Sequence, residues 1–266
     1  VKPLIELMEA LPTVVLGFLA GLWLAPFLEN NLLGIFSLLI VTPLSILLAA
    51  FVWTRLPEAI RFRMPDGWEA ALLIPVIIIM GYLSFVIAGP IEMVFFGGDM
   101  RSYITNDLGI TYDQRNAMVV GFAMGFAVIP TIFSIAEDAV FTVPKQLTYG
   151  SLALGATPWQ TLRRVVLPTA SPGIFSALMI GMGRAVGETM IVLMATGNTP
   201  IMDINIFEGM RTLAANIAVE VPESEVDSTH YRILFLAALV LFMFTFVVNT
   251  LAEIIRQRLR RKYSTI

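Results

Sequence analysis

An arginine and a glutamate lie four residues apart, at Arg184 and Glu188, within an otherwise apolar stretch of the chain. Residues at positions i and i+4 of a helix share one face, so the two side chains are expected to pair across one turn. A charge at the centre of a bilayer costs at least about 2.5–3.5 kcal/mol, which a pair of leucines would avoid. Two interpretations remain open: a buried ion pair that fixes helix packing, or a guanidinium that binds an oxyanion in a water-lined path.

Glycines surround this charged pair. Under the second interpretation, Glu188 orients the arginine and keeps it from trapping the anion. Gly181, Gly183 and Gly187 would leave room for a ligand or for the close approach of another helix.

The segments that must position the pair are expected to cross a membrane. Apolar residues make up 57% of the 266 residues and charged residues only 14%, against about 25% charged in soluble domains. A bilayer core about 30 Å thick needs about 20 apolar residues of helix. We therefore predict an all-α integral membrane protein with about six transmembrane helices. The runs without charge have 19 to 25 residues each, and they cover 10–28, 30–54, 70–91, 116–136, 165–183 and 233–252.

The fifth run holds two prolines, Pro168 and Pro172, which are expected to break its first part. The fifth helix is therefore predicted to start after Pro172 and to continue past Arg184 and Glu188 to about Thr196. This places the charged pair at membrane depth.

The distribution of Lys and Arg predicts the orientation, because basic connections stay in the cytoplasm. Segments 54–69, 137–164 and 253–266 contain three, three and five of them, whereas 29–31, 92–115 and 197–231 contain none, two and one. We therefore expect a multi-pass membrane protein with both ends of the sequence in the cytoplasm. The acidic segment 197–231 is expected outside. The sequence opens on Val1, and we expect that a longer N-terminal part precedes it.

Several kinds of chemistry find no support in the residues. The chain has no cysteine and a single histidine, His230, expected to be a solvated loop residue, so thiolate or multi-histidine metal sites are excluded. No lysine lies in a Gly-Lys-Ser/Thr phosphate loop, and no nucleophile elbow is present. We expect a protein that is not itself an enzyme and has no metal site, no cofactor of its own and no nucleic-acid partner.

Two connections are expected to be structured. In 143–168, residues 145–154 suit a short helix that Gly155 ends in a left-handed conformation. Thr157, Pro158 and Gln160 predict the capped start of a second helix, which runs to about Val166 and stops at Pro168. In 206–219, an apolar stripe predicts an amphipathic helix.

The motif "GRAVGETMIVLMATGN", Gly183 to Asn198, resembles the hallmark of permease subunits of phosphate-specific (Pst) ABC importers, and its details fit the C-type subunit. The 143–168 hairpin resembles the EAA loop of that family: Gly155, Val165, Leu167 and Pro168 match its pattern, with Val165 in place of its Ile. Its initial triplet does not match, because the chain has Tyr149, Gly150 and Ser151 there. Further resemblances are "ELMEALPTVVLGF", "AANIAVEV" and "HYRILFLAALVLF".

The resemblance implies a permease of the type I importer (MetI-like) fold with cytoplasmic coupling helices, located in the bacterial inner membrane. Its expected partners are a dimer of ATP-binding cassette ATPases that bind the ATP, a second permease subunit, a periplasmic phosphate-binding protein and the lipid bilayer. It also implies the site residues. Those on the substrate pathway are Arg184, Gly187, Glu188 and Thr189, and those that couple to the ATPase are Tyr149, Gly150, Ser151, Gly155, Ala156, Leu167 and Pro168.

The resemblance covers about 1–32 and 116–266. We therefore predict a first core transmembrane segment at 1–32, an insertion with two extra helices at 33–115, and the permease core at 116–266. The function implied is ATP-driven import of inorganic phosphate. Alternatives left open are a permease for another oxyanion, such as sulfate or molybdate, an ATP-independent anion carrier, and a membrane scaffold or sensor.

Overall fold

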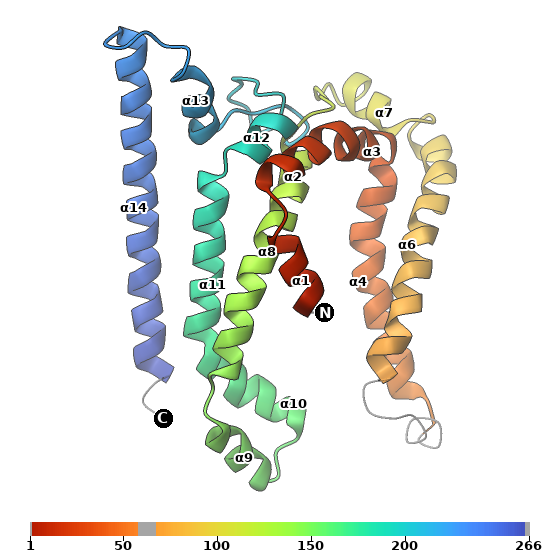
Figure 1. The fold of residues 1–266 in the computed structure, drawn as a ribbon. Helices are drawn as coiled ribbons and strands as arrows, with labels where there is room; N and C mark the ends of the chain where they lie inside the picture. The colour runs from red at the N-terminus through yellow and green to blue at the C-terminus, as the bar shows by residue number, and fades with distance from the viewer. Residues whose placement is uncertain (1, 58–67, 264–266) are drawn as a thin grey trace. The chain divides into compact units, whose positions relative to one another are not determined.

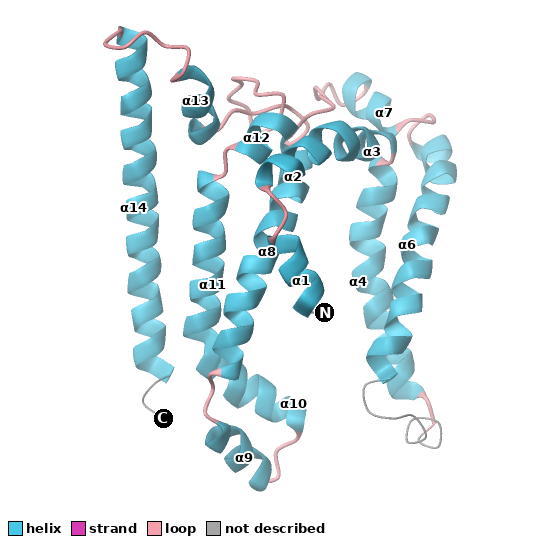
Figure 2. Cartoon of the chain, viewed as in Figure 1, coloured by secondary structure: helices cyan, strands magenta, loops and turns pink. Residues whose placement is uncertain are grey.

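The computed structural model describes residues 2–57 and 68–263, which form helices joined by loops without any strand (Figures 1 and 2). The all-α prediction is confirmed. The chain divides into two compact units, Val1–Leu22 with Arg115–Ile266, and Trp23–Gln114. Each unit is described by itself.

The first unit holds the charged pair and the hairpin. Its helices are α1 (Lys2–Glu9), α2 (Thr13–Leu19), α8 (Ala117–Phe141), α9 (Lys145–Ala153), α10 (Pro158–Thr161), α11 (Leu167–Gly187), α12 (Met190–Ala195), α13 (Leu213–Glu220) and α14 (Thr229–Tyr263). Helix α8 packs along α11, and α11 also packs against α14 (Figure 1).

The second unit contains α3 (Ala25–Asn30), α4 (Leu32–Arg55), α6 (Trp68–Phe95) and α7 (Met100–Asn106). The π-helical turn η1 (Ala20–Leu24) leads into it from α2. Helices α4 and α6 pack closely, and a Cβ at Gly34 would lie only 2.6 Å from the Phe85 ring. Arg61 and Arg63 of the predicted basic loop lie outside the described residues.

Six helical segments of the described chain are long and apolar enough to cross a membrane, as predicted. They are Thr13–Asn30, Leu32–Arg55, Ala71–Phe95, Ala117–Phe141, Pro158–Gly187 and Thr229–Lys262. Most large apolar side chains on α4, α6 and α14 are exposed. Such surfaces suit contact with lipid, so the chain is a multi-pass membrane protein.

The predicted limits of the fifth span are wrong at both ends. Helix α10 continues through the π-helical segment η2 (Leu162–Val166) into α11, so Pro168 and Pro172 lie inside a continuous helix. Pro168 is tolerated because it lies in the first turn of α11, and the π-helical segment before it changes the hydrogen-bond pattern there. At the other end α11 stops at Gly187 and does not reach Thr196.

Two glycines allow α2 and the turn after it to pack closely on α12. A Cβ at Gly17 would lie 2.9 Å from the carbonyl oxygen of Met190, and one at Gly21 would lie 2.6 Å from that of Met194. Real Cβ atoms need more room than this, so glycine is required at both positions. The spacing Gly-xxx-Gly is a known signal for close helix packing in membranes.

Candidate functional site

Arg184 lies in the last turn of α11, and its side chain contacts α8 instead of Glu188. One guanidinium nitrogen, Nη1, donates a 2.7 Å hydrogen bond to the hydroxyl oxygen of Thr131. Thr131 lies near the middle of α8, so the guanidinium lies beside the middle of a helix that can span the membrane. The predicted Arg184–Glu188 pair is wrong: no ion pair or hydrogen bond joins these two residues, both of which are described.

Glu188 caps the next helix instead of pairing with the arginine. Its backbone is extended, with φ −67° and ψ 127°, so the chain leaves the helical path at this residue. One carboxylate oxygen, Oε1, accepts hydrogen bonds from the backbone N–H groups of Thr189, Met190 and Ile191 at 3.2, 3.1 and 3.5 Å. These N–H groups at the start of α12 have no partner within the helix, and a negative charge beside them is favourable.

Thr131 joins Arg184 to a second carboxylate that no sequence pattern indicated. The Thr131 hydroxyl donates to Oε1 of Glu9, the last residue of α1, at 3.4 Å. Arg184, Thr131 and Glu9 thus form a chain of hydrogen bonds across three helices of one unit. Thr131 and Glu9 are 122 positions apart in the sequence, so no local spacing rule could have found the contact.

The glycines around Arg184 have different roles. A Cβ at Gly181 would lie 2.5 Å from the Ile132 side chain, so this glycine permits close packing of α11 on α8. A Cβ at Gly187 would meet no described atom within 4 Å, so space is open beside it. Thr189 follows the break in the helix, and its hydroxyl donates to the carbonyl oxygen of Gly187 at 3.3 Å.

The hairpin formed by α9 and α10 is stabilised by local contacts. Gly155 has φ +86°, the left-handed conformation that glycine adopts without steric cost. Thr157 and Gln160 form a reciprocal capping box at the start of α10, with hydrogen bonds of 3.0 and 3.2 Å. Ser151 and Thr161 share a 3.0 Å hydrogen bond between their hydroxyl groups, which ties the two helices together.

The other coupling candidates lie around this hairpin. The backbone N–H of Ala156 donates to the carbonyl oxygen of Ser151 at 3.2 Å, and Leu167 and Pro168 begin α11. Gly150, Ser151 and Pro168 help to line a groove of about 450 Å³ between α9 and the start of α11. Tyr149, Leu154 and Trp159 expose 63%, 91% and 66% of their surface, so the hairpin presents large apolar side chains to its surroundings.

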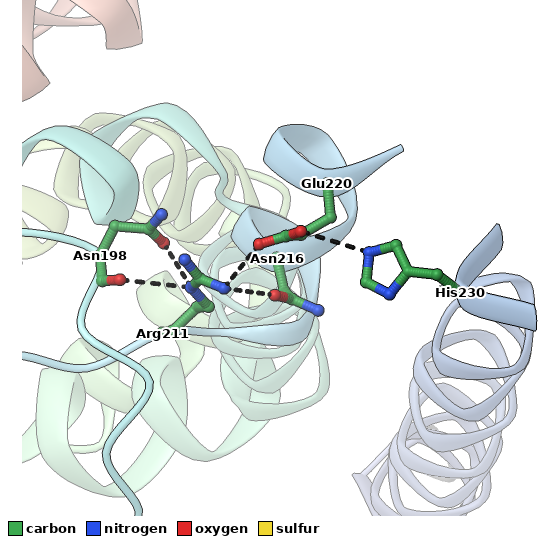
Figure 3. A network of polar contacts seen from close by, with 5 residues as sticks. All are labelled: Asn198, Arg211, Asn216, Glu220 and His230. Atoms are coloured by element: carbon green, nitrogen blue, oxygen red, sulfur yellow. Dashed lines mark hydrogen bonds and ion pairs between the residues drawn. The ribbon is translucent and has the colours of Figure 1, made fainter. Parts of the chain in front are cut away.

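A third polar cluster orders the segment between α12 and α14 (Figure 3). Arg211 donates to the backbone and side-chain oxygens of Asn198, at 3.2 and 3.0 Å, and to Asn216 at 2.9 Å. It also pairs with Glu220 at 3.0 Å, and the other Glu220 oxygen lies 3.3 Å from His230 Nε2. In the sequence Arg211 stood out only as a charge, and its partners Asn198, Asn216 and Glu220 are spread over 198–220.

Two expectations for this segment are corrected. The predicted helix at 206–219 is shorter, because α13 begins after its cap, Thr212, whose hydroxyl accepts from the N–H of Ala215 at 3.3 Å. The preceding residues form a loop whose carbonyls at Ile206 and Glu208 accept from Met118 and Ala117 at the start of α8. His230 lies in α14 and not in a loop, although its side chain is exposed.

Known proteins resemble the chain over most of its length. The probable ABC transporter permease protein YqgH of Bacillus subtilis is 31% identical over 88% of this chain and 71% of its own. The phosphate transport system permease protein PstC 1 of Mycobacterium tuberculosis is 31% identical over 85% and 69%, respectively. PstC of Xylella fastidiosa strain Temecula1 is 30% identical over 90% and 75%. No solved structure matches the chain.

The matches to these relatives include part of residues 33–115. A match over 88% of the chain extends into this segment, because the rest of the chain is too short to account for it. The prediction that 33–115 is an insertion relative to shorter family members stays a prediction.

A sequence family matches residues 13–261, which include all of the six candidate spans except Lys262. The same range includes Arg184, Thr131 and the whole hairpin. The chain belongs to the family described as the inner membrane component of binding-protein-dependent transport systems.

Proposed function

We propose that the chain is the membrane-spanning permease subunit of an ATP-driven importer of inorganic phosphate. The family match makes it the membrane component of a transport system, and relatives at about 30% identity are named phosphate transport permeases. The observation that carries the substrate class is Arg184. This cation lies beside the middle of a membrane-spanning helix and has a single neutral partner in the described structure, Thr131.

Arg184 is the residue we assign to the passage of the anion. A guanidinium has five donors in a planar fork, which suits a phosphate oxygen pair. One Arg184 donor is used by Thr131, so donors remain for a ligand. Gly187 supports the assignment because no side chain fills the space beside it, one turn further along the same helix face. In this proposal Glu188 and Thr189 shape the end of α11.

The hairpin is the part we assign to the ATPase subunits. Its two short helices are held at a fixed angle by the left-handed Gly155, the capping box and the Ser151–Thr161 hydrogen bond. Its exposed side chains, Tyr149, Leu154 and Trp159, offer an apolar surface for a partner. Since nucleotide hydrolysis takes place on cytoplasmic subunits in this proposal, the hairpin and the basic end of α14 lie in the cytoplasm. The acidic segment after α13 then faces the binding protein.

The proposal is tested by uptake of labelled phosphate in vesicles that contain the assembled importer and its binding protein. We expect uptake that excess sulfate does not reduce. We also expect that Arg184→Gln lowers uptake to the background level, because an amide lacks the positive charge, while the variant still assembles with the ATPase.

A matched control is Arg232→Gln, which removes an arginine from the exposed start of α14 and should leave uptake unchanged. Equal inhibition of uptake by sulfate and by unlabelled phosphate would favour a permease for another oxyanion. Loss of assembly in Arg184→Gln would show that the arginine serves packing.

A further inference from the structure

The hydroxyl of Thr131 separates two opposite charges that do not touch. It accepts a hydrogen bond from Arg184 Nη1 at 2.7 Å and donates its only proton to Glu9 Oε1 at 3.4 Å. No direct ion pair joins Arg184 and Glu9, both of which are described. An anion that binds the free donors of Arg184 therefore has a carboxylate as a neighbour across a single hydroxyl.

The two contacts of Thr131 differ in strength. The bond from the guanidinium is short for a hydrogen bond with a charged donor. The bond to Glu9 is longer than the 2.5–3.0 Å usual between two oxygens, and the Glu9 side chain is exposed. The carboxylate is thus held loosely at the end of α1 and can turn toward a ligand without leaving a buried partner unsatisfied.

An ionised carboxylate can only accept hydrogen bonds. Next to a fully deprotonated oxyanion it is repelled, because two acceptors face each other without a proton between them. Next to an oxyanion that still carries a proton, it gains a hydrogen bond with two charged partners, which is among the stronger kinds. At neutral pH phosphate carries at least one proton and sulfate carries none.

We propose that Glu9, held beside the site by Thr131, selects the protonated oxyanion at Arg184 and so makes this part of the permease discriminate phosphate from sulfate. The inference rests on the proposed function, because it needs an anion at Arg184. In this proposal the positive charge of Arg184 binds either anion. The Glu9 carboxylate accepts a hydrogen bond that only the protonated anion, phosphate, can donate. Thr131 is the positioning residue that keeps the carboxylate within reach of the ligand.

The test must report on this site alone, since a binding protein would select the anion before it reaches the permease. The chain has no cysteine, so Gly187→Cys introduces a single thiol on the Arg184 face of α11, where a Cβ meets no described atom within 4 Å. The assembled importer without binding protein is treated with a thiol reagent, and the labelling rate of this subunit is measured with increasing phosphate or sulfate.

We expect phosphate to slow the labelling at concentrations at least about tenfold lower than sulfate does, the difference that one charge-assisted hydrogen bond can give. Adding Glu9→Gln, which offers an amide donor as well as an acceptor, should make phosphate and sulfate slow the labelling at similar concentrations. Thr131→Val should reduce the discrimination as well, whereas Thr131→Ser, which keeps the hydroxyl, should retain it. The matched control Glu223→Gln, a change of an exposed carboxylate outside the spans, should retain the full difference.

Three failures of the inference can be told apart. Protection by phosphate that stays selective in Glu9→Gln would overturn the role of Glu9 and leave the phosphate permease intact. Absence of protection by phosphate in the parent Gly187→Cys protein would overturn the anion site at Arg184, and the inference about Glu9 with it. Equal protection by both anions in the parent would overturn the selectivity while keeping the anion site.

Discussion

At the scale of single residues, Glu188 contributes to the fold through one carboxylate oxygen. That oxygen accepts three backbone N–H groups at the start of α12. An N–H donor left without a partner away from water costs free energy comparable to a lost hydrogen bond. Glu188 is therefore needed to cap α12 at the point where α11 ends. This requirement does not depend on an ion pair with Arg184.

The capping role of Glu188 predicts different outcomes for two substitutions of this residue. Glu188→Gln keeps an acceptor oxygen and should retain most of the transport. Glu188→Ala removes the acceptor, should destabilise α12 by about 1 kcal/mol, the usual effect of losing a helix cap, and should lower uptake further. Uptake and thermal unfolding of the purified importer check both. An equal loss of uptake in the two variants would show that the charge of Glu188 is what matters.

The sequence indicated the cation of the candidate site but not its surroundings. Arg184 stood out because a charge in an apolar run is rare. Its predicted partner was wrong because the i, i+4 rule assumes that the helix continues, whereas the chain is extended at Glu188. Thr131 and Glu9 meet Arg184 only through the packing of α1 and α11 on α8, which no single stretch of sequence encodes.

At the scale of elements, the hairpin shows which features can be derived from local sequence. Thr157, Pro158 and Gln160 form the predicted helix start, and Gly155 has the predicted positive φ. These signals act within four residues and need no tertiary contact. The end of the second helix was predicted wrongly, because Pro168 lies in the first turn of α11 and the π-helical segment η2 accommodates it.

Gly155 offers a test of the hairpin as a coupling element. Its left-handed conformation costs other L-residues about 1–2 kcal/mol, and no atom would obstruct a new Cβ within 4 Å. Gly155→Val should therefore change the angle between the two helices and uncouple ATP hydrolysis from uptake, without changing membrane insertion. The ratio of phosphate transported to ATP hydrolysed measures this.

Asparagine tolerates the left-handed conformation better than valine does, so Gly155→Asn is the matched control. It should retain a ratio close to that of the parent. A parent-like ratio of phosphate transported to ATP hydrolysed in Gly155→Val would show that the hairpin does not couple ATP hydrolysis to uptake.

The contact between the turn η1, which follows α2, and α12 gives a prediction on stability. A Cβ at Gly21 would lie 2.6 Å from the Met194 carbonyl oxygen, and overpacking of this kind costs typically about 1–3 kcal/mol. Gly21→Ala should thus lower the thermal stability of the purified importer. Gly121→Ala in α8, where the new methyl group meets nothing within 4 Å, should not. Equal stability of both variants would mean that α12 can shift to accommodate the methyl group.

At the scale of the whole molecule, the six spans were the easiest feature to predict. Each follows from a run of about 20 residues without charge, a rule that depends on bilayer thickness and not on the fold. The division into two compact units, Val1–Leu22 with Arg115–Ile266 and Trp23–Gln114, starts the second unit within the predicted segment 1–32, and the predicted insertion at 33–115 stays a prediction. The packing of α2 on α12 within the first unit depends on contacts between distant residues and was not predicted.

The whole importer should depend on its ATPase. We expect uptake of phosphate to fall to the level of empty vesicles when the ATPase subunits carry an inactivating substitution, because in the proposed importer those subunits hydrolyse the ATP and this chain has no Gly-Lys-Ser/Thr phosphate loop. Purified complexes of unchanged subunit composition are the control. Uptake at the full rate with inactive ATPase would favour an ATP-independent carrier.

The continuous helix from Pro158 to Gly187 connects the second helix of the hairpin directly to Arg184. No loop lies between them to absorb a displacement. Over the 21 residues of α11, about 30 Å in length, a tilt of about 10° at the hairpin would carry the guanidinium by about 5 Å, close to one helical turn. In the proposed importer, a small movement at the ATPase subunits would then be enough to displace the Arg184 guanidinium by this distance within the membrane.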